Sequence, residues 1–514
     1  MLLTAPSKAT VQRLDALVIG SGAVGLTAAA ALSRSGRRVL VIESGGTRLD
    51  AFETDSVQVI GRPHQGVHTA RSRALGGTTN LWGGQLVEFQ PADLLAKPTG
   101  DLPGGWPLSF SDLQGYYAKT YDSLGQRFVD DREVLRRIDI AEPSMLPELS
   151  YFLTRWMRRP NVAQTFEAEI RGVGDGSFDV LLDATVHGFA TDDAGVTAVH
   201  LTHHNDSLTI EAPLVFLAAG TVENVRLLLA DTGSPHPWSE NDKIGAYFQD
   251  HLGGIVGSIE GTDVRTMSRL FSTIFLQGDK YMPKVRSVGH TPGTGLSCSA
   301  MIGFDSSATD HLVYLKQLAK AVLYRRGMEQ PFRVDEAIRA ARYVLPLAKG
   351  YLIDHRVTVP RGSQANLLVQ AEQAPRRDSR LIASKENITV SGLPKLQLDW
   401  RWGDLEQENI LIFTSWVAKW LAEEYGVRVT FRGGLDDLAR PSSTLLHDTY
   451  HQAGGLVMGV SPDHSVVDPW QVVHGTRNMV VLGACTFPSS GDANSTFTAM
   501  ALALRAVDHV VGNS

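Results

Sequence analysis

The sequence predicts an α/β fold that opens with a strand, a helix and a second strand, and three neighbouring segments support this. Residues 15–19 are an apolar run typical of a buried strand. The turn Gly20-Ser-Gly-Ala-Val-Gly25 follows and leads into residues 24–35, which have the alanine and leucine content of a helix packed on a sheet. A second apolar run over residues 38–43 completes a Rossmann-like βαβ unit.

Each glycine of this turn has a separate geometric role. Gly20 allows the tight turn, Gly22 lets the backbone approach a pyrophosphate, and Gly25 allows close packing of helix on strand. Glu43 lies 23 residues after Gly20, where an acid accepts hydrogen bonds from an adenosine ribose and disfavours a 2′-phosphate. We therefore expect FAD or NAD, with contacts from Gly20, Gly22, Ala23, Val24, Gly25, Glu43 and Ser44.

The composition limits the possible functions. With 514 residues, of which 43% are hydrophobic and 20% charged, the chain can bury large cores and form two interleaved domains. A net charge of −7 and a pI near 6.1 give no basic surface for nucleic acid. Cys298 and Cys485 are the only cysteines, so we expect neither a disulfide framework nor a metal site. The low cysteine count also favours a reducing, cytoplasmic location.

Neither a secretory signal nor a membrane span is expected. The N-terminal eight residues lack a charged segment followed by an apolar core. No apolar stretch approaches the roughly 18 residues that span a bilayer. Residues 312–326 could form a basic amphipathic helix, which either lies on a membrane or, as is more usual, packs on its own protein.

A second glycine cluster, with four glycines in nine residues, covers residues 76–84. This glycine content excludes an ordinary helix or strand and lets a loop pass close to a flat ligand. Because the cluster follows a dinucleotide-binding unit, we expect it to run along the cofactor rather than to form a surface turn. The expected contacts are Gly76, Gly77, Thr78, Asn80, Leu81, Trp82 and Gly83.

Two further segments return the chain to the first sheet. Residues 212–229 have the pattern of a strand, a glycine turn and a helix, and residues 180–186 that of a short strand. The first domain is therefore expected to be discontinuous, comprising residues 1–95, 165–255 and 440–514.

The remaining residues, 96–164 and 256–439, are expected to form an α+β substrate-binding cap. Residues 395–402 alternate between apolar and polar side chains, as a strand of an antiparallel sheet with one solvated face does. Residues 406–425 have the pattern of a helix.

Five motifs accompany the N-terminal fingerprint along the chain. They are Gly76-Gly77-Thr-Thr-Asn-Leu-Trp-Gly-Gly, Ala218-Ala-Gly220-Thr-Val-Glu-Asn, Ile244-Gly-Ala-Tyr-Phe-Gln-Asp-His251, His451-Gln-Ala-Gly-Gly and Asp492-Ala-Asn494-Ser-Thr-Phe-Thr-Ala-Met. In this order, over nearly the whole chain, they resemble the glucose-methanol-choline (GMC) oxidoreductases. The resemblance implies a GMC fold, FAD in the discontinuous domain and oxidation of an alcohol. The C-terminal motif is more similar to the pyranose oxidase branch than to the glucose oxidase branch, which implies a sugar, glycoside or polyol substrate.

The resemblance points to His451 and Asn494 as the catalytic pair, and the chemistry explains the two residue types. Hydride leaves a carbinol carbon more easily once the hydroxyl proton is removed, so a neutral imidazole with an unperturbed pKa of about 6.5 suits a general base. Asn494 can hold the same oxygen and orient the C–H bond toward flavin N5. The family's second catalytic position is often histidine, and a His/Asn pair is one of its variants.

Alternatives exist for both residues. Only His451 is followed by the glycine pair, Gly454-Gly455, that the family places beside its base, which favours it over the nearby His447, His464 and His474. Asn494 could act solely as the N-cap of an apolar helix over residues 496–511. That helix N-terminus would lie near flavin N1 and C2=O, where negative charge collects on reduction.

The resemblance also concerns how FAD is held. Some family members attach FAD through a histidine in the second glycine cluster, but Leu81 stands at that place and cannot form the bond, which implies non-covalent FAD. Trp82 would lie near the isoalloxazine, or alternatively be an ordinary core tryptophan. Further expected cofactor contacts are Val186, Ala219, Gly220, Gly483, Ala484, Asn494, Ser495 and Thr496.

Two other functions share parts of this pattern. A flavin monooxygenase has the same fingerprint and often a Gly-Asp pair near a late helix, which Gly491-Asp492 matches, although its position next to Asn494 favours alcohol oxidation. A non-catalytic flavin-binding protein would also keep the fold. Retention of both His451 and Asn494 argues against it. The electron acceptor, O2 or another molecule, stays open.

Overall fold

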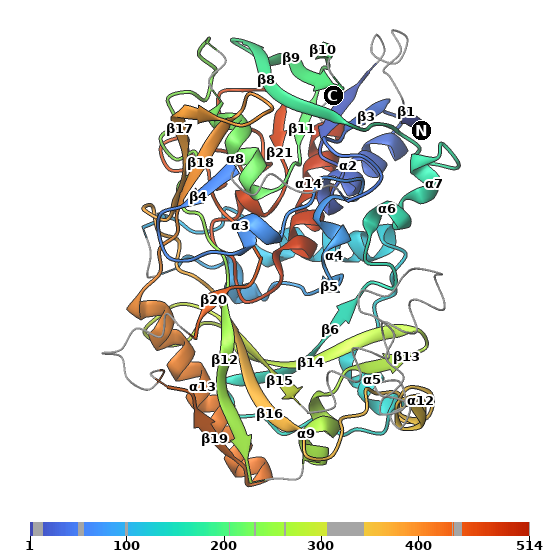
Figure 1. The fold of residues 1–514 in the computed structure, drawn as a ribbon, viewed down its shortest axis with the longest axis vertical. Coiled ribbons are helices and arrows are strands. Elements are labelled where there is room, and N and C mark those ends of the chain that lie inside the picture. Colours follow the sequence, from blue (N-terminus) through green and yellow to red (C-terminus); the bar gives the residue numbers. More distant parts are fainter. Residues whose placement is uncertain are drawn as a thin grey trace, which may run out of the picture.

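The computed structural model describes residues 1–512 except 4–13, 50–55, 98–100, 205, 231–232, 262–263, 306–343, 434 and 436–444. Two sheet-based halves are stacked along the long axis of the molecule (Figure 1). The predicted amphipathic segment 312–326 lies outside the described residues. None of the helices within those residues is long and apolar enough to cross a membrane.

The upper half in Figure 1 contains a six-stranded parallel sheet. Its strands follow the order β1 (Leu2–Leu3), β7 (Asp179–Leu181), β3 (Val39–Ile42), β2 (Ala16–Ile19), β11 (Val215–Leu217) and β21 (Met479–Val481). Helix α2 (Ala23–Arg34) follows β2, and α8 (Thr221–Leu229) follows β11. The C-terminal helix α14 (Ser495–Gly512) packs against α2. This arrangement confirms the Rossmann-like α/β fold.

The lower half is built on a nine-stranded, antiparallel sheet. Its order is β19 (Arg428–Phe431), β12 (Leu252–Glu260), β16 (Gln364–Ala371), β15 (Cys298–Asp305), β14 (Asp279–Ser287), β6 (Leu149–Trp156) and β5 (Gln85–Leu86), with β13 (Ile274–Leu276) beside β14 and β20 (His447–Asp448) beside β12. Helices α9 (Val264–Phe271) and α13 (Asp404–Tyr425) pack on one face, where the rings of Phe271 and Trp420 lie 6.2 Å apart. Gln370 projects from the opposite face and donates a 2.7 Å hydrogen bond to the Asp492 carbonyl near the start of α14.

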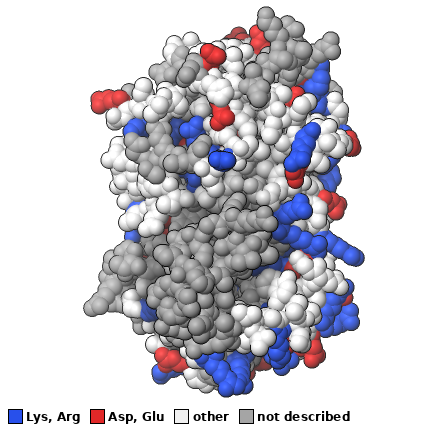
Figure 2. Space-filling model, turned by 45° about the vertical axis from the view of Figure 1, so that its right-hand side comes forward, with Lys and Arg blue, Asp and Glu red and all other residues white. Residues whose placement is uncertain are grey.

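Shorter elements connect these layers. They are α3 (Gly66–Thr69), η2 (Gly77–Asn80), η3 (Pro91–Leu94), α4 (Phe110–Ser123), α5 (Asp131–Arg137), α6 (Val162–Thr165), α7 (Glu167–Ile170), α12 (Val344–Leu352) and η5 (Ala484–Thr486). In the view of Figure 2, acidic and basic side chains share the described surface, in keeping with 48 basic and 55 acidic residues in the chain.

Two strands differ from the sequence prediction. Residues 180–186 do not form one strand, because Asp183 has a φ of 54° and separates β7 from β8 (Ala184–Asp192), which pairs with β9 (Gly195–His203) and through it with β10 (Asp206–Glu211). The strand predicted at residues 395–402 is β18 (Pro394–Asp399). It pairs with β17 (Arg380–Ile388) and β4 (Val57–Val59) and contacts α8, so it lies with the parallel-sheet half.

Candidate active site

The glycine fingerprint has two kinds of glycine. A Cβ on Gly25 would lie 2.0 Å from the Gly20 carbonyl oxygen, and a Cβ on Gly20 would lie 2.4 Å from the Ala218 carbonyl oxygen. These two glycines are therefore required by backbone packing. A Cβ on Gly22 would meet no atom within 4 Å, so this residue presents bare backbone to open space at the N-terminus of α2.

Glu43 braces the fingerprint. Its buried carboxylate accepts hydrogen bonds from the Ser21 backbone N–H at 3.1 Å, the Ser21 hydroxyl at 2.7 Å and the Gly45 N–H at 2.9 Å. Burial raises the pKa of this carboxyl group, and the hydrogen bonds partly oppose that effect. Ser44 lies beside it, half-buried. Sequence reasoning placed Glu43 at a ribose and did not anticipate this internal role.

The second glycine cluster packs directly on the first. A Cβ on Gly77 would lie 2.8 Å from Gly22 Cα, and the Gly76 N–H donates to the Ser21 hydroxyl at 3.3 Å. The Asn80 amide donates to two carbonyls of the same loop, those of Leu75 and Gly77, and so fixes its shape. The cluster thus runs alongside the fingerprint.

The residues that end this cluster differ in exposure. Leu81 is 47% exposed, and Thr78 and Gly83 are also exposed. Trp82 is half-buried and donates its indole N–H to the Pro160 carbonyl at 2.6 Å. Trp82 therefore has a fixed orientation at the edge of the core.

Three parallel strands bring distant segments to one edge. Strands β2, β11 and β21 are neighbours, so the turns after their carboxyl ends place Gly20, Gly220 and Gly483 along the same side of the sheet. Asn224 ties two of these turns together, because its side chain accepts from the Ala219 N–H and donates to the Leu482 carbonyl. Ala484 begins η5 after Gly483. Val186 is buried on β8, whose first residue donates its N–H to the Glu43 carbonyl.

His451 and Asn494 meet although 43 residues separate them. Asn494 Nδ2 lies 2.8 Å from His451 Nε2. His451 follows β20 on the antiparallel-sheet side, whereas Asn494 directly precedes Ser495, the first residue of α14, and Thr496. Asn494 Oδ1 has no hydrogen-bond partner within the described residues. The side chain therefore contacts the histidine instead of capping the helix.

The environment makes His451 a weak proton acceptor that stays neutral. Desolvation lowers its pKa from 6.5 to about 3; the neighbouring His251 and Lys284 add to this effect, and the charge of Asp250 opposes it. The expectation of an unperturbed pKa was wrong, because sequence does not show how deeply a side chain lies. Lys284 is buried on β14, and desolvation lowers its own pKa to about 8.

Three residues that sequence reasoning did not select hold His451 in place. Asp250 Oδ1 accepts the His451 backbone N–H at 2.9 Å and the Thr449 N–H at 3.3 Å. His64 Nε2 lies 3.2 Å from Asp250 Oδ2, with both side chains fully buried. His251 Nδ1 lies 3.0 Å from His451 Nδ1. Asp250 and His251 end the motif at residues 244–251, which was the available signal for them.

The buried cluster of His64, Asp250 and Asp448 places one ligand atom of each within 4.8 Å of the others, a spacing that could hold a metal ion. Both carboxylate oxygens of Asp448, however, accept backbone N–H groups at 2.8 Å, from Gln65 and Gly66. The Asp448 carboxylate therefore connects residues 65–66 to β20 through hydrogen bonds, and this structural role accounts for its position.

The rival histidines lie elsewhere. His447 and His464 are exposed, and His474 Nε2 lies 2.8 Å from the Ser465 hydroxyl. Of the four histidines in this segment, His451 is the one in hydrogen-bond contact with Asn494.

Comparison with known proteins assigns two parts of the chain. Residues 375–503 match the family described as "GMC oxidoreductase", and residues 18–59 match the "NAD(P)-binding Rossmann-like domain". Residues 375–503 are therefore a GMC oxidoreductase C-terminal domain. Among similar proteins, the fructose dehydrogenase large subunit of Gluconobacter japonicus is 19% identical over 97% of this chain and 98% of its own length. Paromamine 6'-oxidase of Streptomyces fradiae is 23% identical over 97% of this chain and 91% of its own length.

Two solved structures share the fold of this protein. A fungal aryl-alcohol oxidase superposes with a TM-score of 0.59 at 14% identity, covering 98% of this chain and 99% of that one. Pyridoxine 4-oxidase from "Mesorbium loti" superposes with a TM-score of 0.55, also at 14% identity, and the alignment covers 96% of this chain and 99% of that one. Both alignments extend over the parallel and the antiparallel half.

The residues present fit FAD, which GMC oxidoreductases generally bind. Gly22 and Gly220 both have free space where a Cβ would lie, and both precede helix N-termini that can face phosphate groups. Asn494 precedes a third N-terminus, that of α14. The donor set is therefore one of backbone N–H groups, which suits a diphosphate and a flavin pyrimidine edge.

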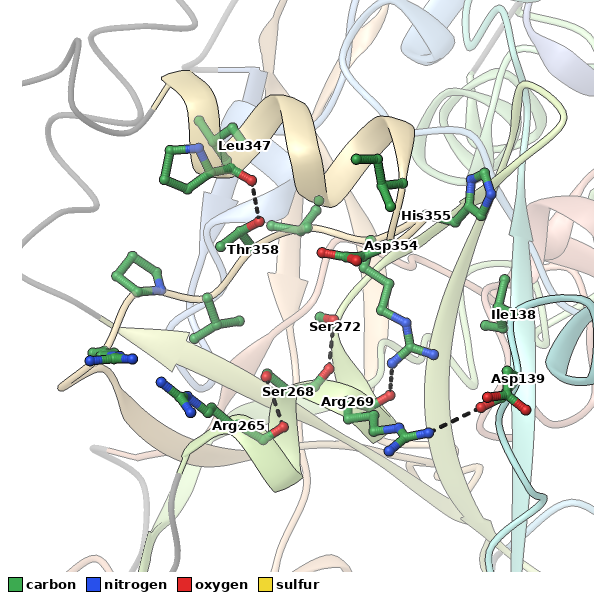
Figure 3. A pocket seen from close by; sticks show the side chains of 18 of the residues that line it. Ile138, Asp139, Arg265, Ser268, Arg269, Ser272, Leu347, Asp354, His355 and Thr358 are labelled. Atoms are coloured by element: carbon green, nitrogen blue, oxygen red, sulfur yellow. Dashed lines mark hydrogen bonds between the residues drawn. The ribbon is translucent and has the colours of Figure 1, made fainter.

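A separate cavity of about 1170 Å³ lies beside α9 and α12 (Figure 3). Arg356 donates to the Arg269 carbonyl there, and Arg269 donates to the Asp139 carbonyl at 3.1 Å. The described residues that line it include none of the predicted site residues. This cavity is distinct from the His451 and Asn494 site.

Proposed function

We propose that this enzyme oxidises a hydroxyl group of a sugar, glycoside or other polyol to a carbonyl, with non-covalent FAD, His451 as general base and Asn494 as the residue that orients the substrate oxygen. The 2.8 Å contact between His451 Nε2 and Asn494 Nδ2 supports this most directly, because it places a base and an amide at one point between the two halves. Bound FAD would supply the hydride acceptor, N5.

The two side chains can act on one oxygen atom. A substrate hydroxyl that replaces their direct 2.8 Å contact can donate its proton to His451 Nε2 while its oxygen accepts a hydrogen bond from Asn494 Nδ2. Asn494 then stabilises the alkoxide character that develops as the proton leaves. Asp250 holds the backbone of His451 and so fixes the base relative to the amide.

The substrate class rests on two supports. The names of the relatives include a fructose dehydrogenase and a paromamine 6'-oxidase, both of which denote sugar-like molecules. The sheet face opposite α9 and α13 also carries Gln370 near Asn494, a polar group of the kind that hydroxyl-rich ligands require. The relatives' names include a dehydrogenase and an oxidase, so O2 or another acceptor re-oxidises the flavin in this proposal.

The decisive experiment measures flavin bleaching under anaerobic conditions. Sugars, glycosides, aminosugars and simple alcohols are screened first, and the best substrate is repeated with O2 or a dye as acceptor. His451→Ala should then lower the rate of flavin reduction by about a hundredfold or more. Asn494→Ala should slow reduction and leave FAD bound.

His474→Ala is the matched control, because His474 lies in the same segment and contacts Ser465 instead of Asn494. It should reduce its flavin at the normal rate. A normal rate in His451→Ala would refute the assignment. Absence of bleaching by any alcohol, with NADPH consumption instead, would support a monooxygenase.

A further inference from the structure

We infer that His251 selects the base-competent tautomer of His451, and that it is therefore a positioning residue for the oxidation. The inference rests on the proposed function for its catalytic meaning, but the tautomer itself is a property of the resting protein. It follows from three contacts in a row, which join Ser490, His251, His451 and Asn494.

The row begins at an atom that can only accept. His251 Nε2 lies 3.3 Å from the Ser490 carbonyl oxygen, so Nε2 carries the hydrogen of this contact. A neutral imidazole has one N–H, and His251 Nδ1 is therefore an acceptor. Desolvation lowers the pKa of His251, against the opposing charge of Asp250, which keeps it in this neutral form.

The next contact transmits this choice to the base. His251 Nδ1 lies 3.0 Å from His451 Nδ1, and two ring nitrogens form a hydrogen bond only if one of them carries a hydrogen. Because His251 Nδ1 accepts, His451 Nδ1 donates. The Thr449 hydroxyl oxygen, 2.9 Å from the same nitrogen, can accept a share of this hydrogen bond.

The last contact shows the consequence. With its hydrogen on Nδ1, neutral His451 has a lone pair on Nε2, which faces Asn494 Nδ2 at 2.8 Å. The Asn494 amide donates to that lone pair, in agreement with the orientation in the structure. The opposite tautomer would place a hydrogen on Nε2 and leave the enzyme without a base at the substrate oxygen.

Nitrogen-15 NMR of the FAD-loaded enzyme with labelled histidine tests the tautomer without turnover. His451→Gln assigns the signals of His451 by their loss. A protonated Nδ1 and an unprotonated Nε2 are expected. A protonated Nε2 in the resting enzyme would overturn the inference, whatever the enzyme's activity proves to be.

Two substitutions test the effect on the reaction. His251→Leu removes the acceptor and should slow flavin reduction about tenfold, the scale of one hydrogen bond. His251→Asn offers an amide oxygen near the place of Nδ1 and should restore most of the rate and the Nδ1-protonated signal of His451. An unchanged rate in a folded His251→Leu enzyme would contradict the positioning role.

His203→Leu is the matched control, because His203 is also buried and its ring centroid lies 4.2 Å from that of His204, outside the site. It should leave the rate of flavin reduction and the His451 signals unchanged. If His451→Ala itself reduces flavin normally, the proposed function fails, while the NMR result still decides the tautomer. If His251→Leu does not fold, the unmodified enzyme's spectrum decides alone.

Discussion

Acidification from about pH 8 to about pH 5 should leave the rate of flavin reduction nearly unchanged, since a base with a strongly lowered pKa stays neutral over this range. Desolvation lowers the pKa of His451 to about 3, and His251 and Lys284 contribute in the same direction. In the proposed reaction, the neutral imidazole is the form that accepts the hydroxyl proton. Its population therefore determines the acid limb of the rate profile.

The structure gives the size of the effect. A histidine that keeps the ordinary pKa of 6.5 would be only about 3% neutral at pH 5, and the rate would fall about thirtyfold. With a pKa of about 3, His451 is about 99% neutral at the same pH, and the rate should change by a few per cent.

Anaerobic stopped-flow absorbance of the oxidised flavin, with saturating substrate, measures this rate directly. The profile of His451→Gln serves as the control for pH effects on flavin or substrate. A thirtyfold fall in the unmodified enzyme that is absent in His451→Gln would show that the base titrates near its ordinary pKa, and would refute the electrostatic description of the site.

The same pKa shift has the opposite consequence for stability. The pKa of His451 is lower in the folded state than in the unfolded state, so below pH 6.5 the unfolded state binds more protons than the folded state does. The free energy of unfolding therefore falls as the pH decreases toward the folded pKa. For His451 the loss between pH 8 and pH 5 is about 2 kcal/mol. His451→Gln should lose that much less stability over the same interval in thermal or denaturant unfolding. Activity should therefore persist at a pH where stability has already declined.

Three further predictions concern the cofactor and the charge near the base. Gly22→Ala should fold normally and bind FAD more weakly, because its Cβ meets no protein atom within 4 Å and would project into the space proposed for FAD. Gly25→Ala should instead lower the free energy of unfolding by about 1–3 kcal/mol, because its Cβ would lie 2.0 Å from a carbonyl oxygen. Thermal unfolding and FAD titration distinguish the two effects, and an unchanged FAD affinity in Gly22→Ala would contradict the role assigned to Gly22. FAD should remain in the supernatant after acid precipitation, since Leu81 cannot bond to it, and a yellow pellet would show a covalent link. Lys284→Met should raise the pKa of His451 by removing a nearby positive charge, which would move the acid limb of the rate profile to higher pH; an unmoved limb would show that Lys284 does not act on the base.

The elements of the fold were predictable where local pattern determines structure. The βαβ unit over residues 15–43 follows from hydrophobic runs and a glycine turn, and helix 406–425 from its periodicity. The partner of β18 was not predictable, because alternation reveals which face is buried and not which strand lies alongside. The break at Asp183 was also not predictable, because its positive φ arises from the turn between two sheets and the hydrophobic pattern does not show where one sheet ends.

Sequence reasoning reached the two residues proposed to meet substrate and not those that hold them in place. His451 and Asn494 carry motif signals, whereas the roles of Asp250, His251 and His64 arise from contacts across nearly 200 residues or more. The lowered pKa of His451 has the same origin, because desolvation is a property of the assembled site.

The proposed catalytic pair joins the two halves of the molecule, and this connects the fold to the proposed chemistry. His451 is fixed to the antiparallel half, since β20 pairs with β12 at Leu252 and Asp448, and Asp250, which holds the His451 backbone, lies two residues before β12. Asn494 is fixed to the parallel half through α14, which packs on α2 of the fingerprint. The proposed base is thus attached to the half proposed to shape the substrate site, and the amide to the half proposed to hold FAD. The distance between His451 Nε2 and Asn494 Nδ2 thus measures how the halves are aligned, and a displacement of one half by about 1 Å is enough to disturb hydride transfer.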